Sequence, residues 1–347
     1  MNILDIQSEM FDYINHISKN ITENISNYES LISPILMELK EVEVKRIIII
    51  ASGSSFNASM AAKPFMQKVL KYEVKVVTPF YFQKYDNMIL EKDIVLVISQ
   101  SGRSSNIISV LKTIQHDYVY MLTSNVDSVA CKYCTRVFDL GIYEEKVEFV
   151  TKGYTLTVLY LMLLGLLLGY ENNKISSKEF DTYYLLLEKC SKNTEINIQN
   201  MLEFYYEHET ELLKIKRFQI IGAGGNYGTA LEGALKIAEV IGIPANGYDL
   251  EEFLHGPYLE TKQDVAVFII NGKGFDGSRA KEIYDSLEVL TNHRYLINDV
   301  DETEELISPL SLVVSFQILT NCLMKSKGIE GQSIESFEFE RRIKSKI

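Results

Sequence analysis

The stretch KRIIIIASGSSFNASMAAKPFMQKVL, residues 45–70, decides the fold. It begins with a β-branched run typical of a buried strand, passes through a Gly/Ser turn and continues with the pattern of a helix. The stretch DIVLVISQSGRSSNIISVLKTI, residues 93–114, repeats this order. Alternating strands and helices predict an α/β fold in which helices cover both faces of a parallel sheet.

The same pattern returns in the second half of the chain. Adding 171 to the number of Gly53 gives Gly224, which lies in the turn of IIGAGGNYGTALEGAL, residues 220–235. The same offset takes Asp93 to Asp264, so two landmarks share one spacing. We therefore expect a duplicated unit: two α-β-α sandwiches, each with a mostly parallel sheet flanked by helices.

This duplication divides the chain into five parts. Residues 1–43 carry apolar side chains at helical spacing, which predicts one or two amphipathic helices that serve packing rather than chemistry. The sandwiches are expected at residues 44–170 and 215–330, and a helical linker rich in Lys and Glu joins them at 171–214. Residues 331–347 form a C-terminal tail.

Composition limits the class of protein. The 347 residues are 46% hydrophobic and 24% charged, which is typical of a globular chain with about two domains and excludes disordered, collagen-like and disulfide-scaffold classes. Because 47 acidic residues outnumber 35 basic ones, the net charge of −12 opposes binding to nucleic acid or anionic lipid. Four cysteines make no disulfide framework and the start lacks a secretion signal, so we expect a cytoplasmic protein.

One segment raises the alternative of a membrane span. It is YTLTVLYLMLLGLLLGY, residues 154–170. Its 17 residues are at the lower limit for crossing roughly 30 Å of hydrocarbon, and it is single and has no marked basic flank. We expect a helix buried inside the protein or in a subunit interface, and no contact with a membrane.

Two turns of the first sandwich carry hydroxyl groups where parallel strands end. They are 52–55 and 99–104. Hydroxyls and backbone N–H groups at helix N-termini bind phosphate without a bulk positive charge. The matching turn of the second sandwich, 270–273, has no hydroxyl, so we expect one phosphate pocket per chain, in the first sandwich. The alternative is that these serines only cap helices.

The helix after the Gly-rich turn of the second sandwich carries candidate acid–base groups. Glu232, Lys236 and Glu239 stand at i, i+4 and i+7, within about 60° on one face. A carboxylate beside an ammonium group can act as a general base while the ammonium stabilises charge on a substrate oxygen. The alternative is a solvated helix pair. His255, before Gly-Pro, is either a second catalytic group or a structural histidine.

Patterns for metals and nucleotide cofactors are weak. The histidines are scattered, and Cys131-x-x-Cys134 has no second pair, so neither zinc nor redox chemistry is favoured. The GAGGNYG turn lacks the GxGxxG spacing of a dinucleotide site. We therefore expect no metal and no cofactor.

Taken together, the motifs carry a family resemblance. ALEGALKIAE (230–239) followed by LHGP (254–257), with SGSSFN (52–57) and SQSGRSSN (99–106) upstream, closely resembles the sugar isomerase (SIS) domain pair of the glucosamine-6-phosphate synthase family. The resemblance runs from about residue 9 to the end. The family's glutaminase half is not expected here, so the chain is similar to stand-alone relatives: fructosamine-6-phosphate deglycases of the fructoselysine and glucoselysine types, and phosphosugar isomerases or deaminases.

The resemblance implies roles for individual residues. Glu239 matches the glutamate that moves a proton between C1 and C2 of the sugar, with Lys236 and Glu232 beside it. His255 matches the histidine of sugar-ring opening, which in the family comes from the adjacent subunit, so a homodimer with a shared active site is implied. Residues expected to bind the phosphate and sugar are Gly53, Ser54, Ser55, Ser99, Gln100, Ser101, Ser104 and Glu232, with Glu145, Thr151 and Lys152 near the pocket.

The C-terminal tail, FEFERRIKSKI, departs from the family pattern. The family ends in a Pro-Arg-x-Leu-x-Lys type segment whose lysine forms a Schiff base with the open-chain ketose. The Pro-Arg landmark is missing here, and Lys344 and Lys346 are both candidates for that lysine. Two alternatives stay open: a basic tail that closes over the phosphate, and a solvated charged end.

These expectations combine into one predicted activity. We expect a phosphosugar-processing enzyme that transfers a proton at C1/C2 of a ketose or ketoamine 6-phosphate, as a fructosamine-6-phosphate deglycase or a phosphosugar isomerase. The alternatives are an amino-sugar phosphate deaminase or aminotransferase-like isomerase, and a non-catalytic sugar-phosphate sensor.

Overall fold

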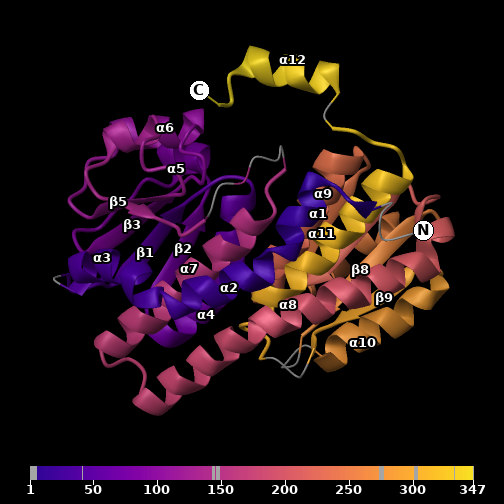
Figure 1. Ribbon diagram of the computed structural model, residues 1–347, viewed down its shortest axis with the longest axis horizontal. Helices are drawn as coiled ribbons and strands as arrows, with labels where there is room; N and C mark the ends of the chain where they lie inside the picture. The colour runs from indigo at the N-terminus through magenta and orange to yellow at the C-terminus, as the bar shows by residue number, and fades with distance from the viewer. Residues whose placement is uncertain are drawn as a thin grey trace.

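The computed structural model describes residues 6–40, 42–142, 145, 149–272, 277–300, 304–331 and 333–346. Two parallel sheets lie at opposite sides of the molecule, with helices between them (Figure 1). This arrangement confirms the α/β fold of two parallel sheets flanked by helices that the repeat predicts.

The first sheet has five parallel strands in the order β2-β1-β3-β4-β5. Its central strands are runs of aliphatic residues that are buried along almost their whole length, because helices cover both faces. The strands are β1 Arg46–Ile50, β2 Glu73–Val77, β3 Asp93–Ile98, β4 Val119–Thr123 and β5 Val137–Asp139; the helices among them are α4 Ser54–Leu70, α5 Pro79–Tyr85, α6 Ser105–Thr113 and the short 3-10 helix η2 Ala130–Tyr133.

The second sheet repeats this topology in the order β7-β6-β8-β9. Its elements are β6 Arg217–Gly222, α9 Gly225–Ile241, β7 Ala245–Asp249, the 3-10 helices η3 Glu252–His255 and η4 Pro257–Glu260, β8 Val265–Asn271, α10 Gly277–Ser286, η5 Leu287–Val289 and β9 Arg294–Asn298. Helices α4 and α9 each have 17 residues and begin 171 residues apart. The duplication therefore extends from sequence spacing to strand order and helix length.

Besides α7 (Lys152–Glu171), five more helices of the described residues pack in the body. They are α1 Glu9–Asn15, α2 Ile17–Ser26, α3 Tyr28–Lys40, α8 Ser177–Leu212 and α11 Pro309–Ser326. The N-terminal segment forms three helices rather than one or two, because backbone turns at His16 and Asn27 interrupt it. Helix α8 spans most of the linker between the halves and begins with a capping box made by Ser176 and Glu179.

Helix α7, Lys152–Glu171, contains the apolar segment that raised the membrane alternative. It is the one described helix that is long and apolar enough to cross a membrane, and 89% of its most apolar window is buried inside the protein. It packs on α3, α4 and α11. The expectation of a buried helix is confirmed, since this helix is apolar all round and surrounded by other helices.

A single hydrophobic core joins the two halves. The inward faces of both sheets contribute to it, as with Ile47 and Ile49 of β1 and Phe218 and Ile220 of β6. Alternate residues of the first sheet, such as Ile48, pack instead in a separate cluster under α5 and α6. The outer face of the second sheet has its own cluster under α10. The central helices are thus shared between the sandwiches.

Candidate active site

The two serine turns lie at the carboxyl edge of the first sheet, each at the start of a helix. Gly53 precedes α4 with φ of +55°, a left-handed conformation that glycine adopts without strain. Neither α4 nor α6 has a side-chain cap hydrogen bond. Within the described part of the chain, no hydrogen bond engages the side-chain hydroxyls of Ser54, Ser55, Ser99 and Ser104. Helix capping therefore does not account for these serines, and their hydroxyls remain available to a ligand.

A neighbouring strand end holds the second turn in place. The carbonyl of Gln100 accepts hydrogen bonds from the hydroxyls of Thr123 at 3.1 Å and Ser124 at 2.7 Å. The amide of the Gln100 side chain donates to Thr157 Oγ1 at 3.2 Å. Sequence reasoning missed Thr123 and Ser124, although two adjacent hydroxyl residues directly after the apolar run 119–122 were the available signal.

Helices α4 and α9 cross in opposite directions at the boundary between the halves. Asn57, in the first turn of α4, donates to Glu232 Oε2 at 2.9 Å. Ala61, one turn later, lies against Gly228, which is nearer the start of α9. The contacting residue numbers increase along α4 while they decrease along α9, so the two helices are antiparallel. The turn at Gly53 therefore lies opposite the C-terminal half of α9. This crossing brings a helix of the second sandwich to the phosphate edge of the first.

The C-terminal half of α9 presents three neighbouring charges. The side chains of Glu232 and Lys236 are fully buried, and that of Glu239 is 30% exposed. Lys236 Nζ lies 3.4 Å from Glu232 Oε1 and also pairs with Glu239. The solvated helix pair considered from the sequence is therefore wrong, because two of the three charges are inside the protein.

The surroundings shift two of these pKa values. Burial lowers the pKa of Lys236, but Glu232 and Glu239 outweigh it and the pKa is raised, so the ammonium stays charged. Burial raises the pKa of the Glu239 carboxyl, and Lys236 opposes this only in part. A carboxylate with a raised pKa is a stronger proton acceptor than an ordinary one, which suits a general base.

The C-terminal tail reaches both parts of this region. Ser105, at the start of α6, donates to the carbonyl of Ser345 from its backbone N–H at 3.1 Å and its hydroxyl at 3.0 Å. Ser104 and Lys346 form an isolated antiparallel bridge. The charge of Lys346 also partly offsets the effect of burial on the pKa of Glu239. Lys346 is therefore near the second serine turn and near the acid–base helix.

The rest of the tail forms helix α12, Ile334–Ile343, which lies apart from the body at the top of Figure 1, with the C-terminal end of the chain on the side of α6. Its two arginines pair with Glu338 on the same helix. Lys344 ends the helix in a left-handed conformation and is exposed. Among the described residues, the Lys344 side chain makes no ion pair or hydrogen bond, so the structure distinguishes the two candidate lysines by position.

The segment before α7 approaches the second turn as well. The carboxylate of Glu145 accepts hydrogen bonds from the backbone N–H groups of Thr151 at 2.7 Å, Lys152 at 3.2 Å and Gly153 at 3.1 Å, so it caps α7. A Cβ on Gly153 would lie 2.7 Å from Gln100 Oε1, which places this capped end beside the turn. The Lys152 ammonium lies over the ring of a tyrosine of α1, 4.9 Å from its centroid.

His255 lies at the other end of the second sandwich. It follows β7, whose carboxyl end is at the edge where α9 begins. Glu239 is 14 residues along α9, which corresponds to about 21 Å at 1.5 Å per residue. His255 is exposed, and no hydrogen bond or ion pair connects it to another described residue. The two groups therefore do not meet within one chain, and the expected contribution from an adjacent subunit stays a prediction.

The equivalent turn of the second half is already filled. Gly224 precedes α9 with φ of +52°, which matches Gly53. A Cβ on Gly224 would lie 2.8 Å from Glu305 Oε1, and one on Gly272 would lie 3.0 Å from Glu305 Cγ. A carboxylate of the protein thus sits where an anion would approach this helix. Sequence spacing could not reveal Glu305, because it comes from outside the repeated motifs.

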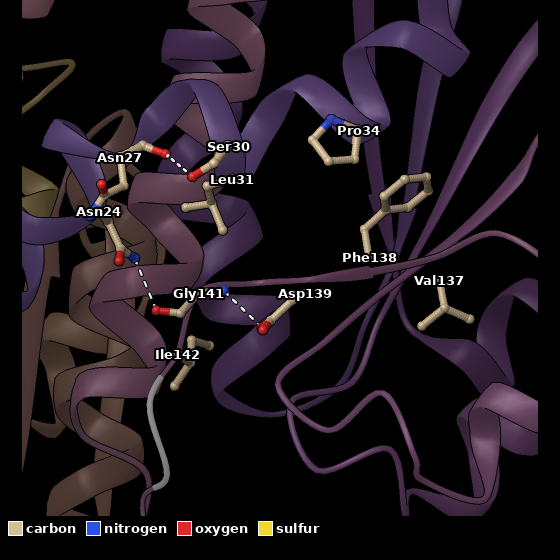
Figure 2. A pocket seen from close by; sticks show the side chains of 10 residues that line it. All are labelled: Asn24, Asn27, Ser30, Leu31, Pro34, Val137, Phe138, Asp139, Gly141 and Ile142. Carbon is tan, nitrogen blue, oxygen red and sulfur yellow. Dashed lines mark hydrogen bonds between the residues drawn. The ribbon is translucent and has the colours of Figure 1, made fainter.

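One cavity of the described structure lies away from these turns. Its volume is about 640 Å³, and it lies beside α2, α3 and the edge strand β5. Figure 2 shows its polar groups engaged with the protein itself: Asn24 donates to the carbonyl of Gly141 at 3.0 Å, and Asp139 accepts from the Gly141 N–H at 2.9 Å. None of the serine turns or α9 lines it. The groups that could bind a phosphate or move a proton therefore lie at the serine turns and on α9 rather than in this cavity.

Metal ligands do not cluster in the described ranges, where no group of three or more His, Cys, Asp or Glu side chains is placed to hold an ion. Cys131 and Cys134 are both free thiols. Cys131 Sγ lies 3.1 Å from Ser128 Oγ, and Cys134 Sγ lies 3.3 Å from the carbonyl of Arg136. Both cysteines therefore have local contacts within their own turn.

Comparison with known proteins gives one family. The model described as "SIS domain" matches residues 42–167 and 211–294. A glutamine–fructose-6-phosphate aminotransferase (isomerizing) from Thermococcus kodakarensis is 28% identical over 339 residues, which cover 90% of this chain and 52% of that protein. The corresponding enzyme of Clostridium perfringens is 25% identical, over 93% of this chain and 58% of its own. The chain thus spans about half the length of these relatives.

Solved structures agree with the fold. A protein of Clostridium difficile 630, whose name assigns it provisionally to the phosphosugar isomerases, aligns with a TM-score of 0.85 and 25% identity, over 97% of this chain and 98% of its own. The C-terminal domain of glucosamine-fructose-6-phosphate aminotransferase from Francisella tularensis aligns with a TM-score of 0.77 and 19% identity, over 94% and 98%. At 19% identity, the similarity to the Francisella tularensis domain concerns the fold alone.

Proposed function

The chain belongs to the SIS domain family, and on that premise we propose that it is an enzyme that moves a proton between C1 and C2 of a ketose or ketoamine 6-phosphate. Its family and its similarity to phosphosugar isomerases support the substrate class. The proposed activity is that of a fructosamine-6-phosphate deglycase or a phosphosugar isomerase.

The crossing of α4 and α9 is the observation that carries this proposal. It sets unpartnered serine hydroxyls at the carboxyl edge of the first sheet opposite a carboxylate of raised pKa. The proposed phosphate anchor is formed by Ser55, Ser99, Ser101 and Ser104 with neighbouring backbone N–H groups. A sugar held at its phosphate extends its C1–C2 unit toward Glu239, and positioning then supplies much of the rate enhancement.

The proposed chemistry needs one base and one local cation. The Glu239 carboxylate removes a proton from C1 next to the C2 carbonyl, and the electron pair forms a C1–C2 double bond with charge on the C2 oxygen. Lys236 and Lys346 provide positive charge beside this carboxylate. Returning the proton to C2, while the O1 hydroxyl proton passes to the C2 oxygen and a carbonyl forms at C1, gives an aldose from a ketose. With a ketoamine, the proton on the amine nitrogen passes to the C2 oxygen instead and an imine forms at C1, which water hydrolyses to an aldose 6-phosphate and a free amine.

We assign sugar-ring opening to His255 of a second copy. Within one chain, Glu239 lies about 21 Å along α9 from the edge of the second sheet where α9 begins, and His255 follows the strand that ends at this edge. An acid–base pair has to lie within hydrogen-bonding reach of one substrate. The proposed enzyme is therefore a homodimer in which each site combines Glu239 of one protomer with a histidine of its partner.

Glu239→Gln tests the base directly. The variant keeps the shape of the side chain but cannot accept the proton, so we expect sugar-phosphate binding to remain and kcat to fall by about 10²-fold or more. Turnover of 6-phosphorylated ketoses, ketoamines and amino sugars would be followed by released aldose phosphate, amine and ammonia. Glu188→Gln, on the exposed face of α8, is the matched control. Unchanged kcat in Glu239→Gln would remove Glu239 from the mechanism.

Mixing two inactive variants tests the shared site. A dimer of one Glu239→Gln chain and one His255→Asn chain contains one site with both changes and one site with neither. After random exchange of equal amounts, half of the dimers are mixed, so we expect recovery to about a quarter of wild-type activity. Recovery that stays at the level of the separate variants would contradict a shared site. The same substrate panel distinguishes a deglycase from an isomerase or a deaminase, and binding without turnover would favour a sensor.

A further inference from the structure

The buried carboxylate of Glu232 receives a neutral hydrogen bond from the other half of the molecule. Its Oε2 accepts from the side-chain amide of Asn57 at 2.9 Å. Its Oε1 accepts no hydrogen bond within the described ranges and lies 3.4 Å from Lys236 Nζ. The phenol of Tyr154, on α7, is fully buried and interacts with this charge without a hydrogen bond to it. Because a buried charge is costly without donors, the Asn57 amide is a main support of this carboxylate.

Two carboxylates compete for the ammonium group of Lys236. The contact with Glu239 is a hydrogen bond, whereas the contact with Glu232 is an ion pair without a hydrogen bond. The ammonium therefore lies on the side of Glu239, the proposed base, although Glu232 is the more deeply buried of the two carboxylates. A neutral donor on Glu232 accounts for this distribution, since it leaves the ammonium free to bond to Glu239.

Asn57 belongs to the first sandwich and directly follows the first serine turn. It lies in the first turn of α4, and its backbone N–H donates to the carbonyl of Gly53 at 3.0 Å. The residue is buried. The turn that we assign to phosphate binding thus fixes the position of an amide that reaches the acid–base helix of the second sandwich.

The duplication indicates that helix packing alone does not account for this hydrogen bond. The offset of 171 residues pairs Asn57 with Gly228 and Ala61 with Glu232, so the contacts Asn57–Glu232 and Gly228–Ala61 are counterparts at one crossing. The second contact is made by small residues: a Cβ on Gly228 would lie 2.4 Å from the Ala61 nitrogen. Close approach of two backbones is sufficient on that side, and the polar pair on the other side needs a different explanation.

We propose that Asn57 is a positioning residue: its amide satisfies Glu232, so that the ammonium group of Lys236 stays hydrogen-bonded to Glu239. Without this donor, the ammonium is the nearest charged partner of the buried Glu232 carboxylate among the described residues, 3.4 Å from its free oxygen. The ammonium is then drawn to Glu232, and Glu239 loses a cation at the place where charge develops on the substrate. The inference rests on the proposed function and adds to it the residue that decides which carboxylate holds the ammonium.

The crystal structure of Asn57→Leu tests this distribution directly. The substitution removes the amide at nearly unchanged volume and leaves the backbone at the crossing in place. We expect Lys236 Nζ to move within about 3 Å of Glu232 and out of hydrogen-bonding reach of Glu239. If Asn57→Leu fails to fold, Asn57→Ala removes the same donor without adding bulk. A Lys236 side chain that stays hydrogen-bonded to Glu239 in the folded variant overturns the proposal.

Asn197→Leu is the matched control. Asn197, on α8, is also buried, and its amide donates to the carbonyl of Ser311 at 3.0 Å. The control therefore makes the same substitution and also removes a buried amide hydrogen bond, but at a different helix contact. We expect the contacts of Lys236 in Asn197→Leu to match those of the wild type.

The pH dependence of turnover is the second measurement. Lys236 lowers the pKa of Glu239, so in Asn57→Leu, where the ammonium moves away, that pKa rises and the acid limb of kcat/KM moves to higher pH. Lys346, the other cation that acts on Glu239, is unchanged. We expect kcat to fall about tenfold and KM for the sugar phosphate to stay within about twofold, because the serine turns keep their groups. An unmoved acid limb, or one at lower pH, contradicts the role of Asn57.

Glu232→Gln in the Asn57→Leu background distinguishes positioning from packing. Removing the competing carboxylate is expected to return Lys236 to Glu239 and the acid limb to its wild-type pH or below, since the charge of Glu232 raises the pKa of Glu239. The position of Lys236 is also read from a crystal structure of this double variant, so the result does not depend on turnover. A packing defect at the crossing would not be reversed, and a Lys236 side chain that does not return overturns the proposal.

These outcomes are separate from those that test the reaction. Loss of turnover in Glu239→Gln, together with wild-type contacts of Lys236 in Asn57→Leu, would overturn the role of Asn57 and leave the proposed reaction intact. The expected movement of Lys236, together with undiminished turnover in Glu239→Gln, would overturn the reaction and leave the role of Asn57 in placing the ammonium.

Discussion

At the residue scale, the chemistry depends on the neighbours of Glu239. Burial raises the pKa of this carboxyl, and the ammonium groups of Lys236 and Lys346 act against that rise. Lys236 belongs to the same helix and is itself buried between two carboxylates. Lys346 arrives from the tail, beside Ser104. Two positive charges thus lower the pKa of Glu239: Lys236, which lies on the same helix, and Lys346, which lies in the C-terminal tail.

Lys346→Met is expected to move the acid limb of the pH–rate profile to higher pH. The positive charge of Lys346 favours the ionised form of Glu239, so without it the pKa of that carboxyl rises and a higher pH is needed to obtain the base. The profile of kcat/KM against pH is the measurement. Lys346→Arg keeps the charge and should keep the wild-type limb, and Lys344→Met is the control in the same tail. If Lys346→Met retains turnover and the acid limb does not move, an electrostatic effect of Lys346 on Glu239 is contradicted. Loss of all turnover in both Lys346 variants would indicate that the Lys346 amine itself reacts with the substrate.

At the element scale, one helix crossing joins binding to catalysis. Gly228 and Ala61 are small enough for α4 and α9 to approach until their backbones nearly touch. Asn57 and Glu232 add a buried hydrogen bond at the same crossing. A wider separation would carry the acid–base face of α9 away from the serine turns.

Gly228→Ala is expected to force this crossing apart. The added Cβ would lie 2.4 Å from the backbone nitrogen of Ala61 and 2.7 Å from the carbonyl oxygen of Asn57, and backbone atoms cannot rotate away. Such overpacking costs about 1–3 kcal/mol, so the midpoint of urea unfolding should fall and KM for the sugar phosphate should rise. Ala238→Ser, at an exposed position of the same helix, should change stability by less than about 0.5 kcal/mol. Wild-type stability in Gly228→Ala would contradict the close approach.

At the scale of the whole molecule, two sandwiches share one core. The inner faces of both sheets and the helices between them form a single hydrophobic cluster. Helix α7 is buried in this layer and packs on helices of both halves, as its contacts with α4 and α11 indicate. Neither sandwich could bury the inner face of its sheet alone, since the helices that cover one sheet also cover the other.

We therefore expect the chain to unfold in one cooperative step. Differential scanning calorimetry on the full chain should give one peak with a calorimetric enthalpy close to the van't Hoff enthalpy. Two separated peaks, or a van't Hoff enthalpy near half of the calorimetric one, would indicate that the sandwiches unfold independently and that the shared core contributes little.

The sequence by itself determined the fold class, the duplication and the position of the turns. These features are local: β-branched runs, Gly/Ser turns and a constant spacing of 171 residues are read along the chain. It also identified α7 as a buried helix, because a helix that is apolar on all sides has no polar face to expose to solvent. The residue types expected in the site were read from the same local motifs.

Only the tertiary structure decided which of these residues meet. It placed Gly53 opposite the C-terminal half of α9, put Glu305 at the Gly224 turn of the second sandwich, and brought Lys346 rather than Lys344 near Glu239. Spacing along a chain carries no information on the direction in which two distant helices cross or on where a tail docks. Those outcomes depend on packing in three dimensions, where small residues such as Gly228 permit one approach and exclude others.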